Sequence, residues 1–313
     1  MKVNFILSAD LHLNETEKEY SFSVLEEIIN LCIKENCGAL LLAGDIFDSL
    51  SDAEKLRSDF RNTIEKLPPS CAVYFLPGNH EELRAKENVK LESFDFGRAR
   101  LLSEKPWSLH ELSAEAELLA IPFQSDYSGY RDWKVSPKEK PLRLLLAHGT
   151  VPGISFTGPG EETDGTLDED LFSLFSADIA ALGHLHSRYL NKRGDVIIAY
   201  PGSARVWREG ETGKRCVILG RTETSPPRLE QLHLASAGEY RIIPVYVSLQ
   251  GELRRELPED LTPADWLHLD VSGVTEDEPF VIAALEKLIE DLKKQFRRVS
   301  FNTKALFVLE GPP

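Results

Sequence analysis

Apolar and polar positions in the first quarter of the chain alternate between two patterns. Short apolar runs, typical of buried strands, cover residues 3–8, 39–43 and 72–76. Apolar residues recur at helical spacing over residues 17–35 and again over residues 52–67. The order strand, helix, strand, helix, strand predicts a parallel or mixed sheet with helices packed outside it.

The middle of the chain is richer in strand patterns than in helical ones. Six further apolar runs cover residues 118–121, 142–147, 179–182, 196–200, 215–219 and 229–234. No long helical pattern separates the last three of them. A second β-rich layer is therefore expected beside the first sheet.

The pattern of predicted elements changes from about Arg241. Strand patterns and one amphipathic helix follow, at residues 242–249, 266–271, 280–296 (the helix) and 299–309. This is the pattern of a small α+β unit. We therefore predict two domains, residues 1–238 and residues 239–313.

Composition and charge narrow the class of protein. No segment is long and apolar enough for a transmembrane span, and the N-terminus lacks the apolar stretch of a secretory signal, so we expect a cytoplasmic protein without membrane association. The four cysteines form no CxxC pair, which leaves zinc-finger and thioredoxin functions without support. The formal charge of −15 counts against an autonomous, high-affinity DNA-binding protein, although bound cations and local basic patches still permit a nuclease.

Five short polar motifs each follow one of the predicted strands. They are Asp10-Leu11-His12, Gly44-Asp45, Gly78-Asn79-His80, Ala147-His148-Gly149 and Gly183-His184-Leu185-His186. Ligands of open α/β sheets bind beyond the carboxyl ends of the strands, so these motifs can converge on one site. Five of the eight histidines fall inside them, which favours a shared chemical role over five separate structural ones.

The motif side chains offer carboxylate, amide and imidazole ligands but no thiolate. Such nitrogen and oxygen donors suit Mn²⁺, Fe, Co, Ni or Zn²⁺ better than Mg²⁺ or Ca²⁺. Without His80, seven candidate ligands remain, which are too many for one ion and suit two ions that share a carboxylate. Two such ions about 3.5–4 Å apart can clamp a phosphoryl group and hold a hydroxide for in-line attack. His80 could then face the substrate and protonate a leaving oxygen.

In this order, the five motifs resemble those of the calcineurin-like metallophosphoesterases. The resemblance implies an α/β (α+β) fold, a two-layer β-sandwich flanked by helices. It also implies that Asp10, His12 and His186 hold one metal ion, that Asn79, His148 and His184 hold the second, and that Asp45 bridges them. His80 would be the catalytic acid or the group that stabilises the transition state. Two divalent ions are implied, with Mn²⁺ preferred and Fe or Zn²⁺ as alternatives.

A narrower resemblance points to the SbcD-type DNA-repair nucleases. The segments at residues 42–48, 181–186 and 200–203 look like those of this group, which also carries a small α+β capping domain after the phosphoesterase domain. The resemblance implies an exo- or endonuclease acting on DNA, and it leaves room for an SMC-like ATPase partner and for a homodimer. Glu81 follows the Gly-Asn-His motif where an aspartate is frequent in the group.

Several basic residues follow the last metal motif, among them Arg188 and Arg205. They could contact a phosphate backbone, and a solvated hairpin surface explains them equally well. Two other functions stay open beside a nuclease. The acidic charge favours a phosphoesterase for nucleotides or cyclic nucleotides. A non-catalytic, metal-containing scaffold is the third alternative, although such a site has no need of His80.

Overall fold

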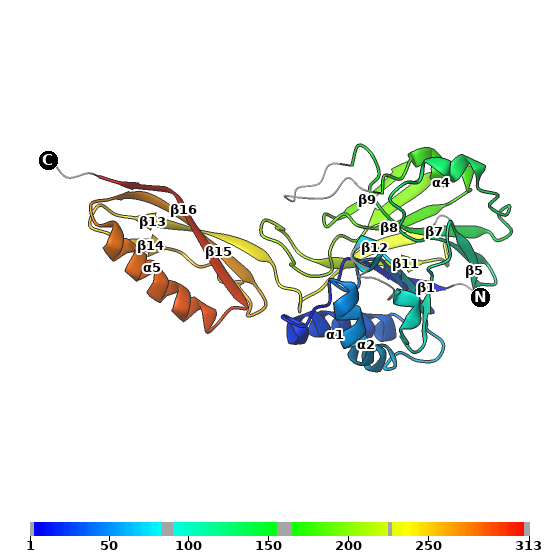
Figure 1. Cartoon of the computed structure of the whole chain (residues 1–313), viewed down its shortest axis with the longest axis horizontal. Coiled ribbons are helices and arrows are strands. Elements are labelled where there is room, and N and C mark those ends of the chain that lie inside the picture. Colours follow the sequence, from blue (N-terminus) through cyan, green and yellow to red (C-terminus); the bar gives the residue numbers. More distant parts are fainter. Residues whose placement is uncertain (1–2, 83–89, 155–164, 225–226, 310–313) are drawn as a thin grey trace. The chain divides into compact units, whose positions relative to one another are not determined.

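The computed structural model describes residues 3–82, 90–154, 165–224 and 227–309, and Figure 1 shows the chain. It divides into two compact units, Met1–Trp207 with Arg215–Ser236, and Arg208–Lys214 with Ala237–Pro313. That residues 1–238 and 239–313 act as separate functional domains stays a prediction.

The first unit contains a six-stranded sheet formed by the two ends of its sequence. The strand order is β12-β11-β1-β2-β3-β4, with bounds β1 Asn4–Ser8, β2 Ala39–Ala43, β3 Ala72–Leu76, β4 Ala99–Leu101, β11 Cys216–Arg221 and β12 Arg228–His233. Strands β1 to β4 are parallel, and β11 joins β1 in the antiparallel direction. The carboxyl ends of β1, β2 and β3 therefore lie at one edge of the sheet.

A second six-stranded sheet forms the other layer of the first unit. Its order is β5-β6-β7-β8-β10-β9, with bounds β5 Ser108–Ser113, β6 Ala116–Ile121, β7 Leu142–His148, β8 Ile179–Gly183, β9 Tyr189–Arg193 and β10 Val196–Tyr200. Strands β6, β7, β8 and β10 are parallel to one another. One core cluster joins residues of both sheets, including Leu7, Leu41, Leu118 and Leu146, which are all fully buried. The expected two-layer β-sandwich is thus confirmed.

Helices flank the sandwich, as expected. Helix α1 (Lys18–Lys34) buries Val24, Ile28 and Cys32 along one stripe, and α2 (Leu50–Ile64) packs beside it (Figure 1). The shorter helices are α3 (Asn79–Glu82), α4 (Glu169–Leu174), and the 3₁₀ turns η1 (Leu91–Ser93) and η2 (Ser128–Asp132). None of the helices in the described part of the chain has the length and apolar content to cross a bilayer.

The second unit is a four-stranded sheet with one helix. The order is β14-β13-β15-β16, with bounds β13 Tyr240–Val247, β14 Leu253–Arg255, β15 Trp266–Thr275 and β16 Arg298–Val308. Helix α5 (Glu278–Lys293) lies along one face of this sheet (Figure 1) and packs Leu285 and Ile289 against Val245 and Leu269. The Asp277 carboxylate accepts the N–H of Phe280 and so begins the helix. The small α+β unit expected from the sequence is therefore present, with β14 added.

One buried ion pair stands out in the first unit. Arg143 in β7 is 1% exposed, and its Nε donates to Glu117 of β6 at 2.7 Å. The same guanidinium donates to the carbonyl oxygens of Phe175 and Ser136. Each of its three nitrogens therefore donates a hydrogen bond inside the protein, and loss of Arg143 would leave a buried carboxylate uncompensated.

We expect the Arg143→Ala variant to unfold more easily than the wild type, by about 3–5 kcal/mol, because Glu117 would stay buried without its partner. Urea denaturation followed by circular dichroism measures the difference. Arg131→Ala is the matched control, because its pair with Asp170 is solvent-exposed and should contribute under about 1 kcal/mol. Similar losses in the two variants would contradict this account of the core.

Candidate metal centre

The five sequence motifs lie together at one edge of the sandwich. Asp10, Asp45 and Asn79 follow the ends of β1, β2 and β3, whereas His148 ends β7 and His184 follows β8. Strand direction explains this, because β1, β2 and β3 run parallel to one another in the first sheet and β7 and β8 run parallel in the second. All eight polar motif residues are buried, including His12, His80 and His186.

The first group of candidate ligands comes from the loop after β1 and the loop after β8. Donor atoms of Asp10, His12 and His186 all lie within 4.8 Å of one another. Nε2 of His12 is 3.2 Å from Nε2 of His186, and Oδ1 of Asp10 is 3.8 Å from the latter atom. An imidazole binds Zn²⁺ at about 2.0–2.1 Å, so two nitrogens on one ion lie roughly 3 Å apart. The spacing found here fits a cation between them.

The second group comes from the loops after β2, β3 and β8 and from the end of β7. Donor atoms of Asp45, His148 and His184 lie within 4.8 Å of one another. Oδ1 of Asn79 is 3.0 Å from Nε2 of His148 and 3.1 Å from Nδ1 of His184. The Nδ1–H of His148 donates to the Ala43 carbonyl at 2.7 Å. Nε2, the nitrogen that faces the other donors, is therefore the atom that would carry the lone pair of the neutral, metal-binding ring.

Asp45 lies between the two groups. Its Oδ2 is 3.4 Å from Nε2 of His148 and 3.9 Å from Nε2 of His80. Asp45 also forms a third cluster with His12 and His80. The Nδ1–H of His80 donates to the Asp48 carbonyl at 2.8 Å, which leaves Nε2 directed toward Asp45. This carboxylate is placed where a shared ligand of two ions would be.

The backbone of the motif loops adopts a conformation that is costly for side-chain-bearing residues. The φ angles are 52° at Asp10, 45° at His12, 51° at Asp45 and 96° at His184. Positive φ is uncommon in residues other than glycine and concentrates at functional sites. Four of the seven candidate ligands therefore owe their direction to strained backbone, which the surrounding packing must hold.

Two motif glycines allow the loops to approach one another. A Cβ at Gly78 would lie 2.2 Å from Oδ1 of Asp45, and one at Gly183 would lie 1.9 Å from the Ala43 carbonyl oxygen. Either contact is far inside van der Waals distance. Any side chain at these two positions would push apart the strands that carry the candidate ligands.

Glu81 is a buried anchor whose importance the sequence did not reveal. Its carboxylate accepts the backbone N–H groups of Asp45, Ile46, Phe47 and Gly78, at 2.6–3.1 Å. Burial and the adjacent Asp45 carboxylate raise the pKa of Glu81 to about 8. The side chain thus ties the loop after β2 to the loop after β3.

The pKa values of the buried candidate ligands are typical of a site that binds cations. Burial raises the pKa of Asp10 to about 6. Burial also disfavours the charged forms of Asp45 and His148, but their mutual attraction outweighs it. This attraction lowers the pKa of Asp45 and raises the pKa of His148 to about 9. Without a metal ion, the imidazolium of His148 supplies the positive charge beside Asp45.

Of the two basic residues predicted to bind substrate, Arg205 requires a correction. It is fully buried, and its guanidinium donates to the carbonyl oxygens of Leu11 and His12, both at 2.7 Å, and to the Glu17 carboxylate at 2.6 Å. Its side chain therefore has no access to a phosphate. It holds the loop that carries Asp10 and His12 instead. Arg188 is exposed, and its contact with substrate stays a prediction.

Trp207 is a further neighbour of the site, and it belongs to none of the sequence motifs. Its indole stacks on the ring of His12, with ring centroids 3.8 Å apart and an angle of 4° between the planes. It meets the rings of His80 and His186 edge-on, at 5.3 and 5.4 Å. Trp207 thus covers the side of the site where the first group of donors lies.

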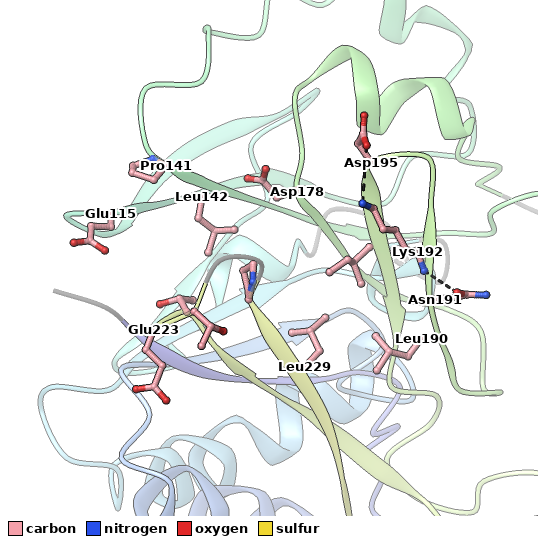
Figure 2. A pocket seen from close by; sticks show the side chains of 14 residues that line it. Glu115, Pro141, Leu142, Asp178, Leu190, Asn191, Lys192, Asp195, Glu223 and Leu229 are labelled. Carbon is pink, nitrogen blue, oxygen red and sulfur yellow. Dashed lines mark hydrogen bonds and ion pairs between the residues drawn. The ribbon is translucent and has the colours of Figure 1, made fainter.

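A separate cavity of about 790 Å³ lies away from the motif residues (Figure 2). Leu142, the first residue of β7, lines it, whereas His148 ends the same strand. Its walls carry the acidic side chains of Glu115, Asp178 and Glu223. Because none of the motif residues lines it, this cavity is not the candidate metal centre.

Comparison with known proteins agrees with this geometry. Residues 3–188 match the family of calcineurin-like phosphoesterases, so the chain belongs to that family of metallophosphoesterases. Purple acid phosphatase PPD1 from yellow lupin has a similar fold, with a TM-score of 0.51 and 16% sequence identity, over 77% of this chain and 53% of the phosphatase. The metallophosphoesterase fold expected from the motifs is confirmed.

Two relatives are similar in sequence to about two thirds of this chain. Metallophosphoesterase YhaO of Bacillus subtilis (strain 168) is 25% identical over 246 residues, which are 69% of this chain and 57% of YhaO. DNA double-strand break repair protein Mre11 of Thermoplasma acidophilum is 24% identical over 214 residues, which are 64% of this chain and 54% of Mre11. The chain thus spans about half the length of these relatives.

The Arg205→Ala variant should lose about 3–5 kcal/mol of unfolding free energy, because two loop carbonyls and the Glu17 carboxylate lose their buried partner. Chemical denaturation checks this. The exposed Arg188→Ala variant serves as the control and should change stability by less than about 0.5 kcal/mol. If Arg205→Ala were as stable as the wild type, the anchoring role would be wrong.

Proposed function

We propose that this chain is a dinuclear metal-dependent phosphodiesterase that cleaves DNA, in the manner of the SbcD-type nucleases. The observation that carries the proposal is the pair of buried donor groups on either side of Asp45, with Nε2 of His80 directed toward that carboxylate. Membership of the calcineurin-like phosphoesterase family supports metal-dependent phosphoester hydrolysis. The DNA substrate and the roles of individual residues are proposed from the geometry of the site and from the resemblance to the SbcD-type nucleases.

In this proposal each donor group would hold one divalent ion, and Asp45 would be shared between them. Asp10, His12 and His186 would hold the first ion, and Asn79, His148 and His184 would hold the second. Mixed nitrogen and oxygen ligands suit Mn²⁺, our preferred ion, as well as Fe or Zn²⁺. When bound, the pair supplies Lewis acidity toward a phosphoryl group and its nucleophile.

His80 acts on the substrate rather than on a metal ion. Its Nδ1–H is engaged by the Asp48 carbonyl, so the ring orientation is fixed and Nε2 is free to face a reacting phosphate. From Nε2 it donates a proton to the leaving oxygen or a hydrogen bond to the charge that develops on the phosphoryl oxygens. A purely structural metal site has no use for such a group, which argues against the scaffold alternative.

DNA is the proposed substrate because three relatives matched by the chain carry the name DNA double-strand break repair protein Mre11. An SMC-like ATPase partner and a homodimer belong to the same proposal and rest on the resemblance alone. The formal charge of −15 favours a second function, hydrolysis of nucleotides or cyclic nucleotides, since a small substrate needs no extended basic surface.

With Mn²⁺ supplied, the protein should cleave DNA, and His80→Ala should lower kcat by about 10²–10⁴-fold because the leaving oxygen loses its proton donor. Gel assays of labelled DNA measure this beside bis-p-nitrophenyl phosphate and cyclic nucleotides. His233→Ala, an exposed histidine outside the site, is the control and should keep full activity.

The outcomes of that assay separate the alternatives. Hydrolysis of bis-p-nitrophenyl phosphate or a cyclic nucleotide without DNA cleavage would replace the nuclease proposal with the small-molecule one. A protein that carries two metal ions per chain and hydrolyses none of the three substrates would support the scaffold.

Metal binding should release protons and weaken as the pH falls. His148, with a pKa of about 9, is protonated near pH 7.5 without metal, and binding through Nε2 removes that proton. Each released proton lowers Mn²⁺ affinity about tenfold per pH unit below the pKa. Calorimetry between pH 6 and 8, in two buffers that differ in ionisation enthalpy, measures both effects. Affinity that does not change with pH would exclude His148 as a ligand.

A further inference from the structure

We propose that Cys32 and Cys71 form a thiol pair that a hydroperoxide oxidises to a disulfide, which joins the end of helix α1 to the start of strand β3. Cys32 lies in the last turns of α1, and Cys71 directly precedes β3. Both lie at the amino-terminal edge of the first sheet, whereas the candidate metal ligands follow the carboxyl ends of its strands. Oxidation at this position is therefore independent of the proposed function.

The alternation of side chains along β3 places Cys71 on the helical side of the sheet. Tyr74 and Leu76 belong to the core between the two sheets, and Ala72 packs against that core. Successive side chains of a strand point to opposite faces, so Cys71 points toward the layer of helices. In this layer α1 buries a stripe of side chains that includes Cys32. The two thiols are at most 1% exposed.

The end of α1 has the hydrogen bonds of a Schellman motif, which fixes the position of Cys32. The Cys37 N–H donates to the Cys32 carbonyl at 2.9 Å, and the Asn36 N–H donates to the Ile33 carbonyl at 3.2 Å. Asn36 has the positive φ, 49°, that this motif requires. A side-chain contact between the residues joined by the outer bond commonly accompanies the motif. Cys37 is therefore a second neighbour of Cys32.

The pairing of β2 with β3 completes a cluster of three thiols. The Ala72 N–H donates to the Gly38 carbonyl at 2.9 Å, so Cys71 lies beside the residue that follows Cys37. The Cys32 thiol is hydrogen-bonded to the thiols of both Cys37 and Cys71. Cys32 is thus the central thiol of the cluster.

The surroundings of Cys71 make it the thiol that reacts first. The hydrogen bond from Cys32 lowers the pKa of Cys71, and the positive charge of Arg98 lowers it further. The Arg98 guanidinium is held at this turn, because it donates to the carbonyl oxygens of Leu67, Pro68 and Cys71 at 2.6–2.9 Å. Its hydrogen bonds raise the pKa of Cys32. Since the thiolate is the nucleophile, Cys71 attacks the oxidant and Cys32 reacts second.

Hydrogen peroxide supplies the two oxidising equivalents. The Cys71 thiolate attacks one peroxide oxygen, so that an S–O bond forms, the O–O bond breaks and hydroxide leaves. Cys32 gives its proton to this hydroxide and attacks the Cys71 sulfur. The S–S bond forms as the S–O bond breaks, and the second hydroxide takes up the proton that Cys71 first lost. Two thiols and one peroxide thus give one disulfide and two water molecules.

The thiol pair lies just beneath the surface of the protein. Asn36, at the end of α1, and Ser70, directly before Cys71, are both exposed. Helix ends fray, and opening of the last turn of α1 admits a molecule as small as hydrogen peroxide.

The test treats the reduced, full-length chain with hydrogen peroxide at about pH 7.5 and then blocks the remaining thiols with N-ethylmaleimide. Mass spectrometry of the peptides identifies any disulfide. The variants are Cys32→Ala and Cys71→Ala. The controls are Cys37→Ala and Cys216→Ala; the Cys216 thiol is buried elsewhere, against the Pro201 carbonyl at 3.3 Å.

We expect the disulfide between Cys32 and Cys71 to be the main product in the wild type and in both controls, and dithiothreitol to reverse it. In Cys32→Ala, dimedone should trap a sulfenic acid on Cys71, because the second thiol is missing. The oxidised wild type should unfold at a higher urea concentration than the reduced protein, because the disulfide closes a loop that contains β2 and α2. Cys71→Ala should show no such shift.

Three results would overturn the inference. They are a main disulfide between Cys32 and Cys37, thiols that stay reduced until the protein unfolds, and an oxidised wild type that unfolds at a lower urea concentration. None of these readouts depends on hydrolysis, so failure of the proposed function would leave this test intact.

Discussion

The loops after β1 and β2 are hydrogen-bonded to one another beyond the point where the strands end. The N–H groups of Asp10 and His12 donate to the carbonyl oxygens of Gly44 and Asp45, both at 3.0 Å, and Leu13 continues the series to Ile46 at 2.8 Å. The ladder between two parallel strands is thus extended into the loops. Every other feature of the site depends on this constraint, because it fixes both candidate carboxylate ligands in one register.

The constraint also explains how the structure retains a strained backbone. Residues with positive φ each cost of order 1 kcal/mol or more unless their surroundings hold them. Here the backbone hydrogen bonds are reinforced by two buried side chains: Glu81 accepts N–H groups of the Asp45 loop, and Arg205 donates to carbonyl groups of the Asp10 loop. Backbone N–H groups of one loop and backbone carbonyl groups of the other are thus both hydrogen-bonded to buried side chains, and the ligand directions are set before any cation binds.

The site combines an interior built for cations with a protein surface that repels anions. The buried donors lie among rings and carboxylates, whereas the whole chain carries a formal charge of −15. Two divalent ions would reverse the sign of the potential locally. Recognition of a phosphoester would then depend on contacts close to the ions. His80 and Trp207 both lie beside the candidate ligand His12, and the exposed Arg188 follows the last motif.

The sequence by itself determined the parallel strands, the flanking helices, the family and the chemistry of the donor set. It could do so because apolar periodicity and strand-ending motifs are local signals. It missed β4, β5, β9 and β14, which are short or poorly buried strands without an apolar run. Only the tertiary structure showed that Arg205 is an anchor, that Glu81 joins two loops and that Trp207 covers His12. Arg205 and His12 are 193 positions apart in sequence. Whether a charged or aromatic side chain is buried against such a distant partner depends on how the layers pack. The residues next to it in the sequence carry no information about that packing.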